Sequence, residues 1–150
     1  MERDFVEMLS ELNAAGAEYL VVGAHALAAH GVPRATGDLD IWVRATPENA
    51  RRVLEALRNF GAPLFDLSVD DLSKPETVFQ IGVVPVRIDL LTSITGIAFE
   101  EAWAARMPVR VEGVPFGVIG RADLLRNKRA TGRPKDLLDA DALAESSPGS

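Results

Sequence analysis

The chain has 150 residues, enough for one domain with a sizeable core and too few for two independent domains. Its 47% hydrophobic and 25% charged residues are typical of a globular protein in water, and the lack of cysteine excludes disulfides and thiolate metal sites. The net charge of −6 argues against broad, sequence-independent binding to nucleic acid, because such binding needs an excess of Lys and Arg.

The first residues, Met-Glu-Arg-Asp, are charged and lead into an amphipathic pattern. This pattern differs from the uninterrupted apolar run of a signal peptide or a membrane span. We therefore expect a cytoplasmic protein that has no membrane partner.

The first half of the chain alternates helical and strand-like patterns. Apolar spacing predicts a helix over 2–15, a buried strand over 19–22 that ends at Gly23, and a short helix from 24 to about 30. A strand carrying Asp38 and Asp40 follows. Thr46 and Pro47 then offer an N-cap and a first-turn proline for a helix that Gly61 closes.

The second half predicts shorter elements. Residues 62–76 hold two prolines and scattered acids, and we expect mostly loop there. Strands are expected over 77–84 and 86–91, as a hairpin turning at Pro85, and over 109–112 and 115–119; helices are expected over 99–106, 121–131 and 135–144. The order predicts an α/β (α+β) fold: one domain over 1–145, its sheet covered by helices mainly on one face, with C-terminal helices and a disordered tail over 146–150.

Three aspartates stand out, each inside a short apolar run. Asp38 and Asp40 share one face of a strand because side chains alternate with a period of two, and Asp89 lies in another buried strand. Three converging carboxylates would repel one another unless a cation joined them. The pattern therefore favours one or two Mg²⁺ ions and a phosphate substrate. The alternative is structural: carboxylates in salt bridges, with Arg34 or Arg87 as partners.

The junction at Gly23 and Ala24 is a second candidate feature. A glycine between a strand and a helix lets a phosphate approach the backbone, where the helix start offers unpaired N–H groups. The alternative interpretation is a tight turn. Arg34 and Thr36 lie close enough before Asp38 to touch phosphate or orient the metal loop, although Thr36 could equally hold a turn.

Basic residues gather near the C-terminus although the whole chain is acidic. Six of the sixteen lie between 121 and 135: Arg121, Arg126, Lys128, Arg129, Arg133 and Lys135. This cluster is either a solvated helix face or a contact for a triphosphate or RNA. Lys128, midway along the predicted helix, is the candidate cation for the β- and γ-phosphates, with a surface lysine as the alternative. We expect Asp136 to be structural, Trp42 to be core, and His25 and His30 not to ligate metal.

These motifs together resemble the nucleotidyltransferase superfamily with a DNA polymerase beta-like fold. The resemblance rests on Val22-Gly23-Ala24, Asp38-Leu39-Asp40-Ile41 and Asp89. It extends to the small bacterial AbiEii-type branch, often toxin components, through His30-Gly31, Pro33-Arg34-Ala35-Thr36, Ile88-Asp89-Leu90-Leu91 and residues 128–136.

The resemblance implies a mechanism and partners. Asp38, Asp40 and Asp89 would be catalytic and hold one or two Mg²⁺ ions, for which Mn²⁺ could substitute, and Gly23, Ala24, Arg34, Thr36 and Lys128 would bind a nucleoside triphosphate. A nucleoside monophosphate would pass to a hydroxyl of RNA, tRNA or protein, with a cognate antitoxin and a homodimer as candidate partners. Ala24 departs from the usual Gly or Ser, which favours a second hypothesis: a catalytically weak or inactive nucleotide-binding or interaction module.

Overall fold

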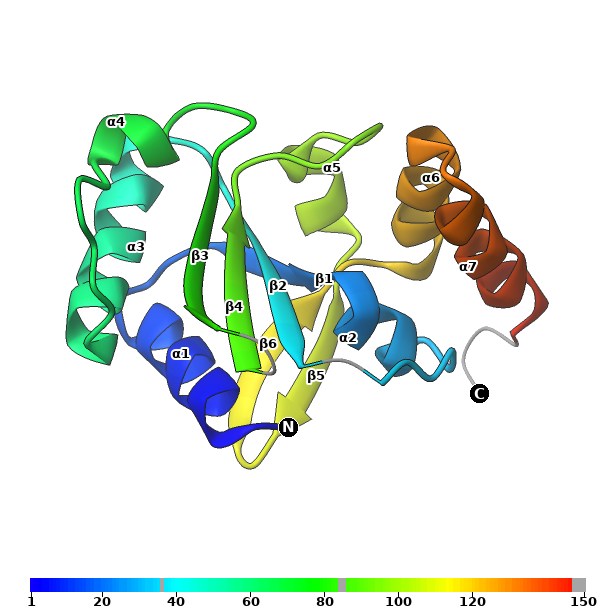
Figure 1. The fold of residues 1–150 in the computed structure, drawn as a ribbon, viewed down its shortest axis with the longest axis horizontal. Coiled ribbons are helices and arrows are strands. Elements are labelled where there is room, and N and C mark those ends of the chain that lie inside the picture. Colours follow the sequence, from blue (N-terminus) through cyan, green and yellow to red (C-terminus); the bar gives the residue numbers. More distant parts are fainter. Residues whose placement is uncertain (36, 84–85, 147–150) are drawn as a thin grey trace.

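A mixed β-sheet forms the centre of the molecule (Figure 1). The computed structural model describes residues 1–35, 37–83 and 86–146. Within these ranges the sheet has six strands in the order β3-β4-β2-β1-β6-β5. β2 pairs with β4 and β1 with β6 in parallel, and the other neighbours are antiparallel. The mixed sheet confirms the predicted fold class.

The elements follow one another in the predicted sequence, with one addition. The strands are β1 (Tyr19–Val22), β2 (Asp38–Val43), β3 (Val78–Val83), β4 (Val86–Leu91), β5 (Met107–Val111) and β6 (Val114–Val118). The helices are α1 (Arg3–Ala14), α2 (Gly23–Ala29), α3 (Pro47–Phe60), α4 (Val69–Leu72), α5 (Phe99–Ala104), α6 (Arg121–Thr131) and α7 (Pro134–Glu145). None of the helices in the described ranges is both long and apolar enough to cross a membrane.

Helix α3 shows how local sequence sets an element. The Thr46 hydroxyl accepts a hydrogen bond from the backbone N–H of Asn49, at 3.2 Å, and Pro47 occupies the first turn. Gly61 ends the helix in the left-handed conformation, with φ +89°. These signals are local, and the predicted boundaries of α3 are confirmed.

The two faces of β2 have different roles. Leu39, Ile41 and Val43 are fully buried in the core, to which α1 and α3 contribute. Asp38, Asp40 and Trp42 alternate with them and face the other side. Trp42 is 1% exposed and meets the ring of Phe99 on α5 edge-on, which confirms it as core. On this face of β2, the carboxylates of Asp38 and Asp40 therefore lie near the start of the strand, and Trp42 packs against α5 near its end.

Residues 62–76 are mostly loop, as predicted, but they also contain the short helix α4, which was not predicted. Ser68 caps the short helix α4: its hydroxyl accepts from the N–H of Asp71, whose carboxylate accepts from the N–H of Ser68. Ser146, assigned to the disordered tail, instead accepts a hydrogen bond from Arg121 at 2.6 Å. The predicted hairpin turn at Pro85 and the predicted disorder of residues 147–150 fall outside the described residues.

Candidate active site

The parallel pairing of β2 with β4 brings the three aspartates to neighbouring positions. In this register Asp40 lies beside Asp89, and Asp38 lies beside Arg87. Because side chains alternate along both strands, all four point to the same face of the sheet. The register of β2 against β4 therefore brings Asp38, Asp40 and Asp89 to one end of the same face of the sheet, as predicted.

Arg87 lies among these carboxylates. Its Nη2 is 3.1 Å from an oxygen of Asp38 and 3.1 Å from an oxygen of Asp89, and its Nε is 2.9 Å from the other oxygen of Asp89. The guanidinium therefore forms a two-pronged pair with Asp89 and a bridge to Asp38. Asp89 is 8% exposed. These hydrogen bonds raise the pKa of Arg87, first through the hydrogen bond to Asp89.

Gly23 makes room for the third carboxylate. It starts α2 directly after β1, with φ +70°. A Cβ at this position would lie 2.1 Å from Oδ2 of Asp40, a distance that real atoms do not occupy. Both the backbone conformation and the close approach therefore require glycine.

The environment of Asp40 disfavours its negative charge. Burial raises the pKa of Asp40 to about 6, the charges of Asp89 and Asp38 add to the shift, and Arg87 and Lys128 oppose it. A cation bound beside Asp40 would therefore stabilise the charged form of its carboxylate.

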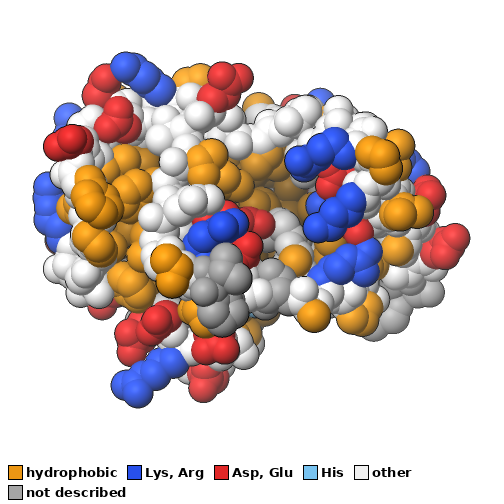
Figure 2. Space-filling model, viewed as in Figure 1, with side chains coloured by type: hydrophobic (Ala, Val, Ile, Leu, Met, Phe, Trp, Pro, Cys, Tyr) orange, Lys and Arg blue, Asp and Glu red, His pale blue; other side chains and the backbone are white. Residues whose placement is uncertain are grey.

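A pocket of about 350 Å³ opens beside Asp38 and Asp40, whereas Asp89 is not among the residues that line it. Its lining residues come from the start of α2, from β2 and the segment before it, and from α6 and α7: Gly23, Ala24, Leu27, Arg34, Ala35, Asp38, Asp40, Lys128, Arg133, Lys135, Asp136 and Asp139. Figure 2 shows acidic and basic side chains together over the middle of the sheet and a row of basic side chains over α6 and α7. One wall of the pocket is thus acidic and the opposite wall is largely basic.

A network of charges holds the basic wall in place. Lys128 Nζ lies 3.3 Å from Asp136 and 3.4 Å from Asp139, and Arg34 pairs with the same Asp139. The Lys128 side chain is only 14% exposed, so the surface-lysine alternative is wrong. Asp139 joins the segment before β2 to α7.

Asp136 anchors the turn between α6 and α7. It accepts hydrogen bonds from Thr131 and Arg133 and is 4% exposed. Burial acts to raise its pKa, but these hydrogen bonds and the charge of Lys128 lower it. Its contacts agree with the expected structural role.

The predicted basic cluster divides in the structure. Arg121 binds the end of α7 at the Leu143 carbonyl and Ser146, and Arg126 pairs with Glu101 on α5. Lys128, Arg133 and Lys135 line the pocket. Only part of the cluster therefore serves the candidate site.

Two predicted site residues need separate comment. Ala24 lines the pocket beside Gly23, and its predicted contact with a nucleotide stays a prediction. Thr36 lies outside the described residues. Of the two arginines considered as partners of the strand carboxylates, Arg87 pairs with Asp38 and Arg34 pairs with Asp139.

Asp139 and the bridging role of Arg87 were missing from the predicted site. Asp136 and Asp139 are spaced i, i+3, which places both on one face of α7, and this spacing was the available signal for Asp139. The imidazole of His30 lies 2.7 Å from the Ile119 carbonyl, and that of His25 stands edge-on to Phe5.

The donor set suits a hard divalent cation, although its present arrangement does not form a ligand shell. Across the described ranges, no three acidic, histidine or cysteine side chains are placed so that they could hold one ion as they stand. Arg87 stands between two of the three carboxylates. Carboxylate oxygens are nevertheless the ligands that Mg²⁺ prefers, and a bound cation would offset the burial and the acidic neighbours that disfavour the charged form of Asp40.

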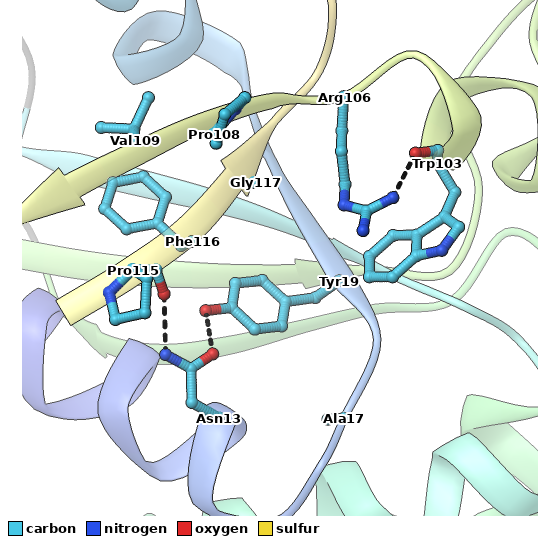
Figure 3. Close-up of a pocket in the computed structure, with 10 residues that line it drawn as sticks. All are labelled: Asn13, Ala17, Tyr19, Trp103, Arg106, Pro108, Val109, Pro115, Phe116 and Gly117. Atoms are coloured by element: carbon cyan, nitrogen blue, oxygen red, sulfur yellow. Dashed lines mark hydrogen bonds between the residues drawn. The ribbon is translucent and has the colours of Figure 1, made fainter.

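A second pocket, of about 270 Å³, lies at the start of β1 (Figure 3). The Tyr19 hydroxyl donates to Asn13 Oδ1 at 2.8 Å, and Asn13 donates to the Pro115 carbonyl at 2.8 Å. Arg106 stacks on Trp103 at 3.9 Å from the ring centre. None of the described residues that line this pocket is acidic, so the carboxylate chemistry belongs to the first pocket.

Comparisons with known proteins bear on the fold. No family model matches the chain, and no curated protein does. A crystal structure of a candidate nucleotidyltransferase from Thermotoga maritima superposes with a TM-score of 0.59 over 95% of this chain and 89% of that chain, at 15% identity. The chain therefore has a nucleotidyltransferase-like fold.

Proposed function

We propose that this protein is a metal-dependent nucleotidyltransferase that moves a nucleoside monophosphate from a nucleoside triphosphate to a hydroxyl of an acceptor. The observation that carries the proposal is the pairing of Asp40 with Asp89 across β2 and β4, next to a pocket that Asp38 and Asp40 line on one side and Lys128 lines on the other. The fold shared with the Thermotoga maritima protein supports the same reaction class.

Asp38, Asp40 and Asp89 would hold one or two Mg²⁺ ions, with Mn²⁺ as a substitute. Bound Mg²⁺ would neutralise charge on the triphosphate and lower the pKa of the acceptor hydroxyl. Asp89, on the strand nearer the sheet edge, would accept the proton of that hydroxyl.

The rest of the pocket would bind the triphosphate. Lys128 and Arg34 offer positive charge opposite the carboxylates, and Gly23 lets a phosphate approach the backbone. Phosphate oxygens would accept hydrogen bonds from these groups while the reacting phosphorus faces the aspartates. Lys128 and Arg34 are already held by Asp139, so little side-chain entropy would be lost on binding.

The acceptor would approach along β3, which is the edge strand beside Asp89. We propose RNA, tRNA or a protein side chain as its source. A second copy of the chain, or a partner protein, would supply the surface that holds the acceptor beside β3. A toxin role with a cognate antitoxin predicts growth arrest on expression, relieved by co-expression of that partner.

A labelling experiment tests the proposal. Purified protein is incubated with Mg²⁺, each α-³²P-labelled triphosphate, total RNA and total protein. We expect label transfer that is lost in Asp40→Ala and Asp89→Ala but kept in Asp70→Ala, an exposed acid on α4. Absence of transfer by the wild-type protein with every triphosphate and both acceptor pools would contradict the proposal.

The second candidate is a nucleotide-binding module without catalysis. Ala24 favours it, because a methyl group lines the pocket where a serine hydroxyl could contact phosphate. The lost hydrogen bond to a charged group is worth about 1.5–3 kcal/mol. Equilibrium dialysis separates the two candidates, since triphosphate binding with no label transfer supports the module.

A further inference from the structure

Arg87 satisfies two of the three carboxylates without any metal ion. It lies two residues before Asp89 on β4 and beside Asp38 on β2, so its side chain rises between them. The same Nη2 is 3.1 Å from an oxygen of each aspartate. A single guanidinium nitrogen thus occupies the space between Asp38 and Asp89.

A divalent ion shared by these aspartates would need that space. Mg²⁺ binds oxygen at about 2.0–2.1 Å, so the two oxygens would have to close in by about 1 Å on a point now held by nitrogen. The guanidinium and the ion cannot be there together. Their charges would also repel at such a separation.

The charge count shows that one arginine is not enough. Three carboxylates face one guanidinium, which donates hydrogen bonds to Asp38 and Asp89, while the third carboxylate, that of Asp40, lies beside Asp89 on the neighbouring strand. Without an ion, Arg87 therefore fills the space between Asp38 and Asp89, and its single positive charge does not balance the three carboxylates.

We propose that Arg87 is a built-in counter-cation that competes with the divalent ion for Asp38 and Asp89 and must leave them when the ion binds. The inference rests on the proposed function, because it concerns the metal of that same site. It makes the affinity for the ion alone low and ties ion binding to a movement of Arg87.

The surroundings give the guanidinium a way out. The Arg87 side chain is 28% exposed, and its neighbour on the edge strand is Gly82, which has no side chain to cover it. Arg87 can therefore turn toward solvent over β3 without displacing core residues. There it would stand on the side proposed for the acceptor.

Mn²⁺ binding to metal-free protein, followed by electron paramagnetic resonance at fixed ionic strength, tests the competition. We expect Arg87→Met to bind Mn²⁺ with a Kd about tenfold lower than the wild type, since a competing charge is removed. Arg87→Lys keeps a charge but loses the two-pronged pair, so its Kd should fall between the two. If Arg87→Met does not fold, the lysine variant alone carries the test.

Thermal unfolding provides a readout that is independent of activity. In EDTA, Arg87→Met should melt below the wild type, and Mn²⁺ should raise its Tm by more than it raises that of the wild type. Arg44→Met is the matched control. Arg44 also pairs with two acids, Glu18 and Glu100, but lies just beyond the other end of β2, so Mn²⁺ should not rescue its loss.

The outcomes separate this inference from the proposed function. Wild-type protein that binds Mn²⁺ while Arg87→Met and Arg87→Lys bind it no better overturns the competition and leaves the metal-dependent enzyme standing. Failure of the wild type and both variants to bind Mn²⁺ at millimolar concentration overturns both proposals.

Discussion

Gly23 is the residue on which the geometry of the acidic wall depends most directly. Its positive φ and its contact with Asp40 are separate constraints, and a side chain would violate both. Gly61 has a similar φ of +89°, but a Cβ added there would meet nothing within 4 Å. A substitution at Gly61 would therefore test backbone strain alone, whereas the same substitution at Gly23 would test strain together with displacement of the Asp40 carboxylate.

We expect Gly23→Ala to lower label transfer by at least about tenfold and to destabilise the protein by more than the roughly 1–2 kcal/mol of left-handed strain. Gly61→Ala should cost only that strain and leave transfer unchanged. Chemical denaturation and the labelling assay measure the two effects. Equal transfer by both variants would show that the contact with Asp40 has no role in the site.

Asp40 makes the metal-free protein less stable as the pH rises. Its folded-state pKa of about 6 lies above the ordinary value of 3.8, so between these values the folded chain binds more protons than the unfolded chain. Stability contributed by the protonated form is present below about pH 4 and is lost as the pH rises through 6.

In EDTA at pH 7.5, Asp40→Asn should therefore be more stable than the wild type, by about 1–2 kcal/mol after allowance for solvent screening. At pH 4.5 the difference should shrink. Urea unfolding at both pH values measures it. A variant less stable than the wild type at pH 7.5 would contradict the origin of the shift, and the gain in stability should come with a loss of transfer.

At the level of the elements, α6 and α7 position the basic wall through Asp139. This side chain is 3% exposed and contacts both Lys128 and Arg34. Removing its charge would leave two cations beside the pocket without their shared anion. Loss of one partner of a buried ion pair lowers the free energy of unfolding substantially. The loss is smaller here because water reaches Arg34, whose side chain is 35% exposed.

We expect Asp139→Asn to lower the free energy of unfolding by about 2 kcal/mol. It should also raise the KM for the triphosphate by more than it lowers kcat. The two cations that would bind the triphosphate lose the anion that orients them, whereas the three aspartates proposed to carry the reaction stay in place. Asp141→Asn, an exposed acid on the same helix, is the control. A fall in kcat with an unchanged KM would place Asp139 outside triphosphate binding.

The elements also show what sequence reasoning can reach. The N-cap Thr46, the first-turn Pro47 and the closing Gly61 are local signals, and they predicted the observed limits of α3. Helix α4 was missed because two prolines and scattered acids hid a single capped turn. The partner of Arg34 lies 105 residues away, and no local pattern identifies such a contact.

Across the whole molecule, the two edges of the sheet differ in chemistry. β5 carries Pro108 and Arg110, which discourage pairing with another strand. β3 has neither charge nor proline, and Val83 is 79% exposed. The unprotected edge is the one beside Asp89.

Val83→Lys should slow aggregation on heating, with little change in Tm, because a charge on an open edge opposes strand addition. Leu138→Lys is the control, since Leu138 is 68% exposed but lies on α7. Light scattering during a thermal ramp measures both. Equal protection by the two variants would mean that general charge, and not the edge of β3, limits aggregation.

The contact between Arg87 and Asp38 joins positions 49 residues apart in the chain. No hairpin or short fragment contains both Asp38 and Asp89, so the three aspartates cannot come together before the parallel strands β2 and β4 have paired. Long-range strand pairing of this kind forms late and slowly. The proposed nucleotidyl transfer should therefore disappear in the same cooperative step as the tertiary structure, and it should return during refolding only after most secondary structure has already formed.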